Sequence, residues 1–195
     1  MAIPSRRRKG LKTKKSMLLV CEGTHTEVSY FESIRQLLRK PNVTVEVHGE
    51  GKSQMALLDA AKAKIKNNKR DIVSSWVVFD KDDVTREQIE KTSKKAKERS
   101  IKVGFTNICF ELWLLMHFQK VGNPIDKKQL YRALESYLEI TNYEKLKGDW
   151  ELIEKIAYKY KTAIKNNKKL FSSQSDKFTN PYSNIFEILE EIEEL

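Results

Sequence analysis

Cysteine and histidine are scarce in this sequence, and long apolar runs are missing. The two cysteines, Cys21 and Cys109, have no paired spacing and stand among apolar residues, which favours free buried thiols in a reducing compartment. With three histidines and no Cys/His cluster, a structural zinc site is not expected. The longest apolar stretch, residues 108–118, is too short to cross a bilayer, and the basic N-terminus lacks the apolar segment of a secretory signal. We therefore expect a cytoplasmic protein with no membrane contact.

Basic residues outnumber acidic ones. The chain of 195 residues holds 37 Lys and Arg against 27 Asp and Glu, a formal net charge of +10, and 39% of its residues are hydrophobic. This composition is typical of a globular protein with a phosphate-rich partner. Residues 1–15 carry seven basic side chains and no acidic one. They predict a flexible arm that grips phosphates, with a merely solvated tail as the alternative. The nucleic-acid contacts expected from this charge pattern and from two turns described below are Arg6, Arg7, Arg8, Lys9, Lys52 and His25.

Apolar runs alternate with amphipathic helical patterns through the first part of the chain. Strands are predicted at residues 16–21, 43–48, 75–79 and 101–105, with helices between them. This alternation predicts an α/β fold whose mostly parallel four-stranded sheet is flanked by helices. The later pattern is helical, at residues 109–118, 127–138, 149–165 and 183–194. The expected organisation is an arm at 1–15, an α/β domain at 16–120 and a helical extension at 121–195 packed on the same domain.

Several helices begin with recognisable capping residues. Thr24 with Glu27, and Thr85 with Gln88, fit the capping-box spacing. Residues 51–53 (GKS) resemble the end of a P-loop, but Glu46 stands where that motif needs glycine, so an ATPase site is not expected. A turn with a helix cap remains there, or a phosphate site at the helix N-terminus that would involve Lys52.

Acidic residues follow two predicted strands directly. Glu22 comes after the apolar run 17–21, and Asp80 and Asp82 come after the run 76–79. The carboxyl ends of parallel strands form the usual ligand site of an open α/β sheet. Asp80 and Asp82 are two residues apart, so they point the same way if the strand geometry persists. Carboxylates gathered at one edge repel one another unless a cation lies between them, and Mg²⁺ prefers oxygen ligands. The alternative is an ordinary acidic turn or loop at each place.

Glu111 is the single charged residue in the apolar segment 108–118. A buried carboxylate is costly unless it is paired or binds a metal, so Glu111 is either a site residue or the partner of a lysine or backbone group. His117 lies six residues later and points away from Glu111 on a regular helix, which favours a core or surface role. His25, in the turn beside Glu22, either acts on a phosphate or proton or is an exposed loop residue.

Several of these segments together resemble the RloB-like proteins. The resemblance rests on residues 21–27 (CEGTHTE), 76–83 (WVVFDKDD), 107–118 (NICFELWLLMHF) and, more weakly, 180–183 (NPYS). The core of this family is similar to the TOPRIM fold of primases, topoisomerases and OLD-type nucleases, so the resemblance implies a TOPRIM-like sheet. TOPRIM domains carry a glutamate after the first strand and Asp-x-Asp after a later one, which correspond here to Glu22, Asp80 and Asp82. The third aspartate is the adjacent Asp83, whereas TOPRIM sites often space it further away.

The residues and the resemblance together predict a metal-dependent nuclease. The expected catalytic residues are Glu22, Asp80, Asp82 and Glu111, with Mg²⁺ or Mn²⁺ held by Glu22, Asp80 and Asp82; Glu22 could instead be a general base. The substrate would be RNA, tRNA included, or DNA. The resemblance further implies a role in bacterial phage defence beside an AAA-type ATPase partner. Two alternatives stay open: a non-catalytic nucleic-acid-binding or regulatory subunit of an ATPase complex, and a scaffold that docks an ATPase through its helical tail.

Overall fold

The structure is a computed structural model that describes residues 16–23, 25–47, 53–68, 71–82, 84–174 and 176–195. The predicted basic arm at residues 1–15, with Arg6, Arg7, Arg8 and Lys9, lies outside the described residues, as do Lys52 and Thr24.

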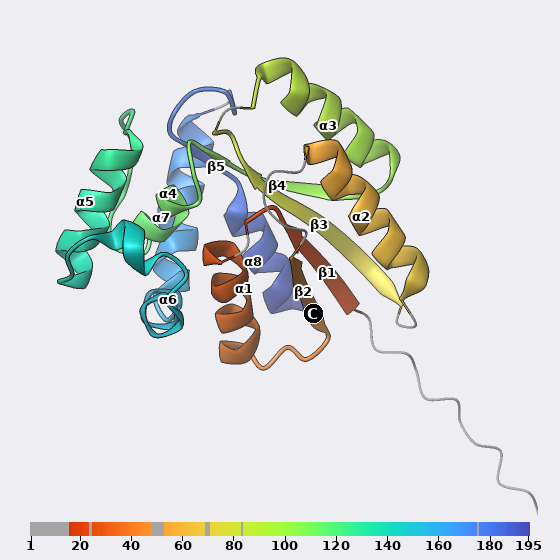
Figure 1. Cartoon of the computed structure of the whole chain (residues 1–195), viewed down its shortest axis with the longest axis horizontal. Helices are drawn as coiled ribbons and strands as arrows, with labels where there is room; N and C mark the ends of the chain where they lie inside the picture. The colour runs from red at the N-terminus through yellow and green to blue at the C-terminus, as the bar shows by residue number, and fades with distance from the viewer. Residues whose placement is uncertain (1–15, 24, 48–52, 69–70, 83, 175) are drawn as a thin grey trace, which may run out of the picture.

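The described strands form one five-stranded sheet in the order β2-β1-β3-β4-β5 (Figure 1). Four of them run parallel: β1 (Ser16–Cys21), β2 (Val43–Val47), β3 (Ile72–Asp80) and β4 (Lys102–Asn107). The fifth, β5 (Tyr182–Ser183), pairs antiparallel with β4. The prediction of four strands was therefore wrong by one. A strand of two residues is too short to show the alternation of apolar and polar residues that identifies strands in a sequence. Its position also depends on Asn167 of α7 (Tyr160–Ser173), whose Nδ2 donates to the Ser183 carbonyl over 2.8 Å.

The sheet reverses its direction of growth beside β1. The chain passes from β1 to β2 on one side and then returns to form β3 on the other side of β1. The connections from these two strands therefore leave in opposite directions and open a crevice outside the carboxyl ends of β1 and β3. Ligands of open α/β sheets bind at such a point.

Nine helical segments complete the described chain. They are α1 (Thr26–Leu37), α2 (Gln54–Asn67), α3 (Arg86–Glu98), α4 (Glu111–Leu115), α5 (Lys127–Leu138), the 3₁₀ helix η1 (Tyr143–Leu146), α6 (Trp150–Ala157), α7 (Tyr160–Ser173) and α8 (Ile185–Glu194). The bounds predicted for α2 and α5 are confirmed. The single helix predicted at 149–165 is wrong, because α6 and α7 divide it. Buried residues keep one helical phase across that junction and neither Gly nor Pro interrupts it, so the pattern gives no sign of the break. No helix in these ranges is both long and apolar enough to span a bilayer.

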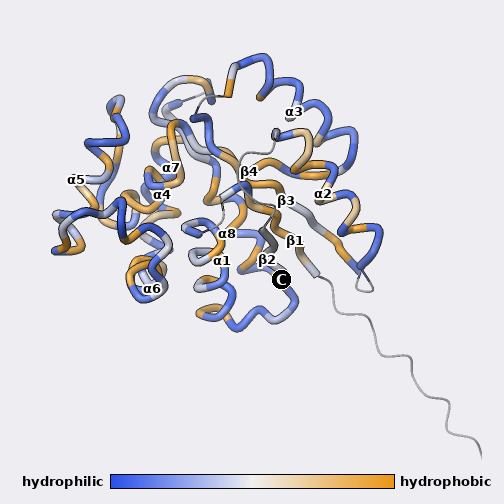
Figure 2. Tube along the Cα trace, viewed as in Figure 1, coloured by the Kyte–Doolittle hydropathy of each residue, from blue (hydrophilic) through white to orange (hydrophobic). Residues whose placement is uncertain are grey.

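The two faces of the sheet bury separate cores. Side chains alternate along a strand, so Leu18, Val20, Val77 and Phe79 face α2 and α3. Their neighbours on the opposite face join a larger cluster with α1, α4 and α8, centred on the fully buried Trp113. Apolar residues of α5, α6 and α7 belong to this second cluster, so the helical segments pack on the sheet's own core. Figure 2 shows the hydrophobic colour concentrated on the strands and on the inner sides of the helices.

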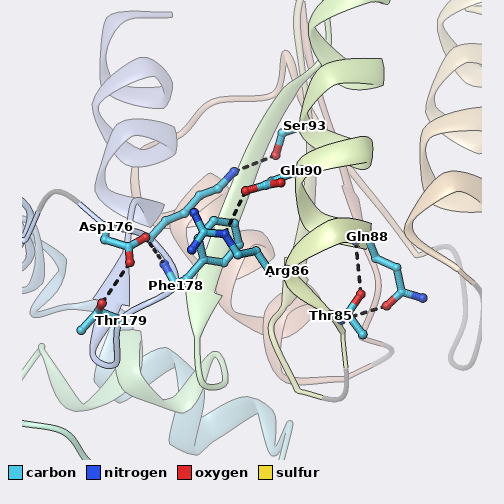
Figure 3. A network of polar contacts seen from close by, with 9 residues as sticks. Thr85, Arg86, Gln88, Glu90, Ser93, Asp176, Phe178 and Thr179 are labelled. Atoms are coloured by element: carbon cyan, nitrogen blue, oxygen red, sulfur yellow. Dashed lines mark hydrogen bonds and ion pairs between the residues drawn. The ribbon is translucent and has the colours of Figure 1, made fainter.

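The loop before β5 is fastened to α3, as Figure 3 shows. The Arg86 guanidinium lies 4.4 Å from the centroid of the Phe178 ring, and Lys177 Nζ donates to Ser93 Oγ over 3.0 Å. The predicted capping box that begins α3 is confirmed, since Thr85 and Gln88 exchange both hydrogen bonds. The Arg86 and Lys177 contacts hold the late segment of the chain against α3.

Candidate functional site

A cavity of about 740 Å³ lies at the carboxyl ends of β1 and β3, where the sheet reverses. Its wall includes every predicted site residue that the structure describes: Glu22, His25, Asp80, Asp82 and Glu111. These residues come from segments far apart in the sequence. The structure therefore brings the predicted acids together, while their chemical roles stay predictions.

Asp80 is the last residue of β3 and lies partly buried in the cavity wall. Its Oδ1 accepts from Thr106 Oγ1 on the neighbouring strand, and its Oδ2 accepts from the Phe110 backbone N–H over 3.0 Å. Burial, together with the charges of Glu27 and Glu111, raises the pKa of Asp80 well above its ordinary value, although the two hydrogen bonds oppose the rise. A carboxylate in this position is costly to ionise without a cation nearby.

Glu22 follows β1 directly and stands next to Asp80 in space. Gln54, the first residue of α2, donates from Nε2 to Glu22 Oε1 over 3.2 Å. Burial raises the pKa of Glu22, hydrogen bonds from Gln54 and the Asp80 backbone lower it, and the charge of Asp82 raises it again. The net rise therefore comes mainly from burial of the carboxyl, with a smaller contribution from the charge of Asp82.

Asp82 differs from Asp80, because the strand geometry on which a shared direction depended does not persist to Asp82. The strand ends at Asp80, and Asp82 has a φ of 23°, which is not extended backbone. Its carboxylate forms an ion pair with Lys127 Nζ at 2.5 Å, and both side chains are nearly half exposed. Asp82 therefore lies on the rim of the cavity, where the Lys127 ammonium neutralises its charge.

Glu111 begins α4 and is 3% exposed. Its Oε1 lies 2.9 Å from Lys147 Nζ, so the lysine partner considered from the sequence exists. Lys147 comes from the loop between η1 and α6 and also lies 4.7 Å from the Tyr131 ring centroid. Burial opposes the charged form of Lys147, but the charge of Glu111 together with hydrogen bonds to Tyr131 and Glu111 raises the lysine's pKa. Both Glu111, which is buried, and Lys147, which is partly exposed, line the cavity.

Glu27 is a site residue that the sequence analysis missed. It was assigned to a capping box with Thr24, but its side chain is 8% exposed and lines the cavity. Burial raises its pKa to about 7, a hydrogen bond to its own backbone opposes this, and the charge of Glu111 adds to the rise. A Cβ on Gly23 would lie 2.1 Å from Glu27 Oε2, so glycine leaves the room that this carboxylate occupies. The sequence signal was a second acid, five residues after Glu22, in one strand–turn–helix segment.

The histidines have different surroundings. His25 is exposed, lines the cavity and packs its Cβ against Gly148. His117 is buried: it lies 3.0 Å from the Tyr30 hydroxyl through Nε2 and 3.0 Å from the Trp113 carbonyl through Nδ1. Burial lowers the pKa of His117 to about 3, so it is a neutral core residue.

The acids are of the ligand type that a hard divalent cation prefers, but their side chains are not arranged as a complete coordination site. Within the described part of the chain, no three His, Cys, Asp or Glu side chains are close enough together to hold a metal ion. Protein groups hold several of the acids separately: Thr106 and Phe110 hold Asp80, Gln54 holds Glu22, and Lys147 holds Glu111. All these groups offer carboxylate oxygens, which Mg²⁺ and Mn²⁺ prefer, and the raised pKa values of Glu22 and Asp80 show that ionising them would be easier beside a positive charge.

Comparison with known proteins gives one match. No curated protein and no solved structure is significantly similar to the chain. The family model described as RloB-like protein matches residues 17–192, which include every described acid and lysine of the cavity. The chain therefore belongs to the RloB-like protein family.

Proposed function

We propose that this protein is a nuclease that uses Mg²⁺ or Mn²⁺ to hydrolyse phosphodiester bonds in RNA, tRNA included, or in DNA. The observation that carries the proposal is the crowding of Glu22, Glu27, Asp80 and Glu111 around one cavity at the switch point of the sheet. Burial and neighbouring charges raise the pKa values of Glu22, Glu27 and Asp80, and a bound cation would offset the cost of ionising these acids.

Asp80 and Glu22 are the proposed ligands, since both line the cavity at the ends of adjacent strands and the Glu22 carboxylate is hydrogen-bonded to the Asp80 backbone. When bound, the cation would polarise a phosphoryl oxygen and lower the pKa of a water molecule. Thr106 and the Phe110 N–H fix the Asp80 carboxylate in place. Asp82, paired with Lys127 on the rim, and Glu27 add further negative charge beside these ligands. Lysines at the cavity attract the phosphate backbone of the substrate.

Family membership supports the proposal without testing it. The glutamate after β1 and the aspartate at the end of β3 occupy the places that TOPRIM domains give to their metal ligands. The TOPRIM likeness of the sheet, the AAA-type ATPase partner and the role in phage defence are part of the same proposal.

The test is cleavage of mixed tRNA, single-stranded RNA and plasmid DNA with Mg²⁺, Mn²⁺ or EDTA. Asp80→Asn and Glu22→Gln keep the size of each side chain and should abolish cleavage. Glu98→Gln is the matched control, because Glu98 is an exposed acid at the end of α3 paired only locally with Lys95. Cleavage that survives in EDTA, or in both site variants, would overturn the proposal.

A second candidate is a non-catalytic subunit that binds nucleic acid and regulates an ATPase. Two observations favour this candidate: Asp80 is hydrogen-bonded to Thr106 and Phe110, and Glu111 is ion-paired with Lys147. Acids that already have protein partners are less available to a metal ion. This candidate predicts nucleic-acid binding without cleavage under every metal condition. A repeat with the partner ATPase present would separate it from an inactive nuclease.

A further inference from the structure

The helical part of the chain reaches into the acidic cavity through one short loop. Lys147 follows η1 and brings its ammonium to 2.9 Å from the Glu111 carboxylate. The two partners differ in burial: the Glu111 side chain is 4% exposed and that of Lys147 is 35% exposed. The acid is closed off on the protein side, while the ammonium remains accessible from the cavity that it lines.

The backbone around Lys147 is fixed on both sides. Gly148 has a φ of 76°, and a Cβ there would lie 2.4 Å from the Cβ of His25. Ser29 Oγ on α1 donates to the Gly148 carbonyl over 3.1 Å. The next residue, Asp149, accepts from the Leu152 N–H over 2.9 Å and caps α6. The loop is therefore seated against the turn after β1, and the lysine starts from a fixed point beside the acids.

A phosphodiester entering this cavity meets strong negative charge and needs a cationic partner within the cavity. Among the described residues of the cavity wall, the lysines are Lys127 and Lys147. Lys127 is paired with Asp82 on the rim, where both side chains are nearly half exposed. Lys147 lies deeper, next to the acids, and the charge of its ammonium also acts on Glu27. A lysine is a compact point charge on a flexible stem, suited to exchanging one anionic partner for another.

We propose that Lys147 is the residue of this site that contacts the substrate phosphate, and that Glu111 is a positioning residue that holds its ammonium toward the cavity. This inference rests on the proposed function, and it assigns to the pair a substrate-binding role.

The experiment separates phosphate contact from a structural ion pair. Glu111→Gln removes the pair while keeping the shape of the side chain. On that background Lys147→Met breaks no ion pair and leaves no buried charge behind. Lys145→Met on the same background is the matched control, since Lys145 is an exposed lysine of η1 two residues away. Binding of a short labelled single-stranded RNA, and of duplex DNA of the same length, is measured in EDTA over a range of salt concentrations.

We expect Glu111→Gln to weaken binding less than the further loss of Lys147 does, because the lysine is held less firmly toward the cavity while one negative charge is removed from it. Adding Lys147→Met should weaken binding about tenfold and reduce the slope of log K against log salt by about 1. Adding Lys145→Met instead should change affinity by less than about twofold. Equal affinities and salt slopes for the two lysine variants would overturn the inference and leave the proposed function standing. A wild-type protein that binds neither probe would overturn both. Lys147→Gln with Glu111→Gln, which allows an amide pair, replaces the first double variant if that variant unfolds.

Discussion

The cavity has two halves that come from different parts of the chain. Its acids lie just after β1 (Glu22), at the start of α1 (Glu27), at and just after the end of β3 (Asp80 and Asp82) and at the start of α4 (Glu111), all within the first 120 residues. Its lysines, Lys127 and Lys147, belong to α5 and the loop after η1. The carboxyl ends of the strands thus concentrate negative charge, and α5 and the loop after η1 place two lysines beside it. The difference teaches that the helical part completes the site and is more than an appendage.

The largest effect should follow from neutralising the acid half at its centre. Asp80→Asn is expected to lower cleavage by more than about 100-fold, since even residues that only support metal ligands contribute about 10–100-fold. The fold should stay intact or gain stability without metal, because the change removes a carboxyl that is costly to ionise. Its amide can donate to Thr106 Oγ1 and its oxygen can still accept from the Phe110 N–H. Urea unfolding beside the cleavage assay checks both parts, and a large loss of stability would contradict the account.

A second prediction concerns the pH dependence that Glu27 imposes. Its pKa is 4.5 ordinarily and about 7 in the folded protein, so the folded state holds the proton more tightly. Stability is then greatest below about pH 4.5 for this group and falls as the pH rises to about 7, by up to about 3 kcal/mol. Glu27→Gln should remove this contribution and make the metal-free protein more stable than the wild type above pH 7. Urea unfolding in EDTA at several pH values measures the difference, and parallel pH curves for the two proteins would refute it.

The link between the two halves can be broken at Gly148. Gly148→Ala should destabilise the protein by about 2 kcal/mol, because its φ of 76° disfavours a side chain and the new Cβ would meet His25. It should also weaken nucleic-acid binding by displacing Lys147. Gly122→Ala is the control, since a Cβ there has no heavy atom within 4 Å and should change stability by less than about 0.5 kcal/mol. Equal effects of the two substitutions in chemical denaturation would show that the loop is not clamped.

The smallest effect is expected at the rim. The Asp82–Lys127 pair is nearly half exposed, so Asp82→Asn should change the free energy of unfolding by less than about 1 kcal/mol. Cleavage should fall by no more than about tenfold, well below the loss for Asp80→Asn. Kinetic measurements on the two variants side by side check this ranking, and an equal loss would place Asp82 among the direct ligands.

The acid half could be predicted from the sequence because its signals are local. An apolar run that ends in an acid identifies both a buried strand and a carboxylate at its end, as for Glu22 and Asp80. The prediction failed where local rules had a competing answer. Glu27 fits the usual capping acid of a first helical turn. Asp82 fits the strand alternation in the sequence, but the backbone leaves the extended conformation after Asp80, and Asp82 has a positive φ.

The lysine half could not be predicted in the same way. Lys147 is one of 37 basic residues, and its neighbours in the sequence do not distinguish it from Lys145. Its role depends on the loop that Gly148 seats against His25, which is a tertiary contact. The fifth strand was missed for a similar reason, since β5 has two residues and its hydrogen bonds come from β4 and Asn167.

The most direct test of the central claim is a calorimetric titration of the wild type and Asp80→Asn with Mn²⁺, in two buffers of different ionisation enthalpy. The account predicts that the wild type binds Mn²⁺ and releases protons near pH 7, because Glu27 and Asp80 have raised pKa values. It predicts that Asp80→Asn loses both the binding and the proton release. Equal binding by the two proteins, or no binding by the folded wild type, would contradict the claim that the acidic cavity is a metal site.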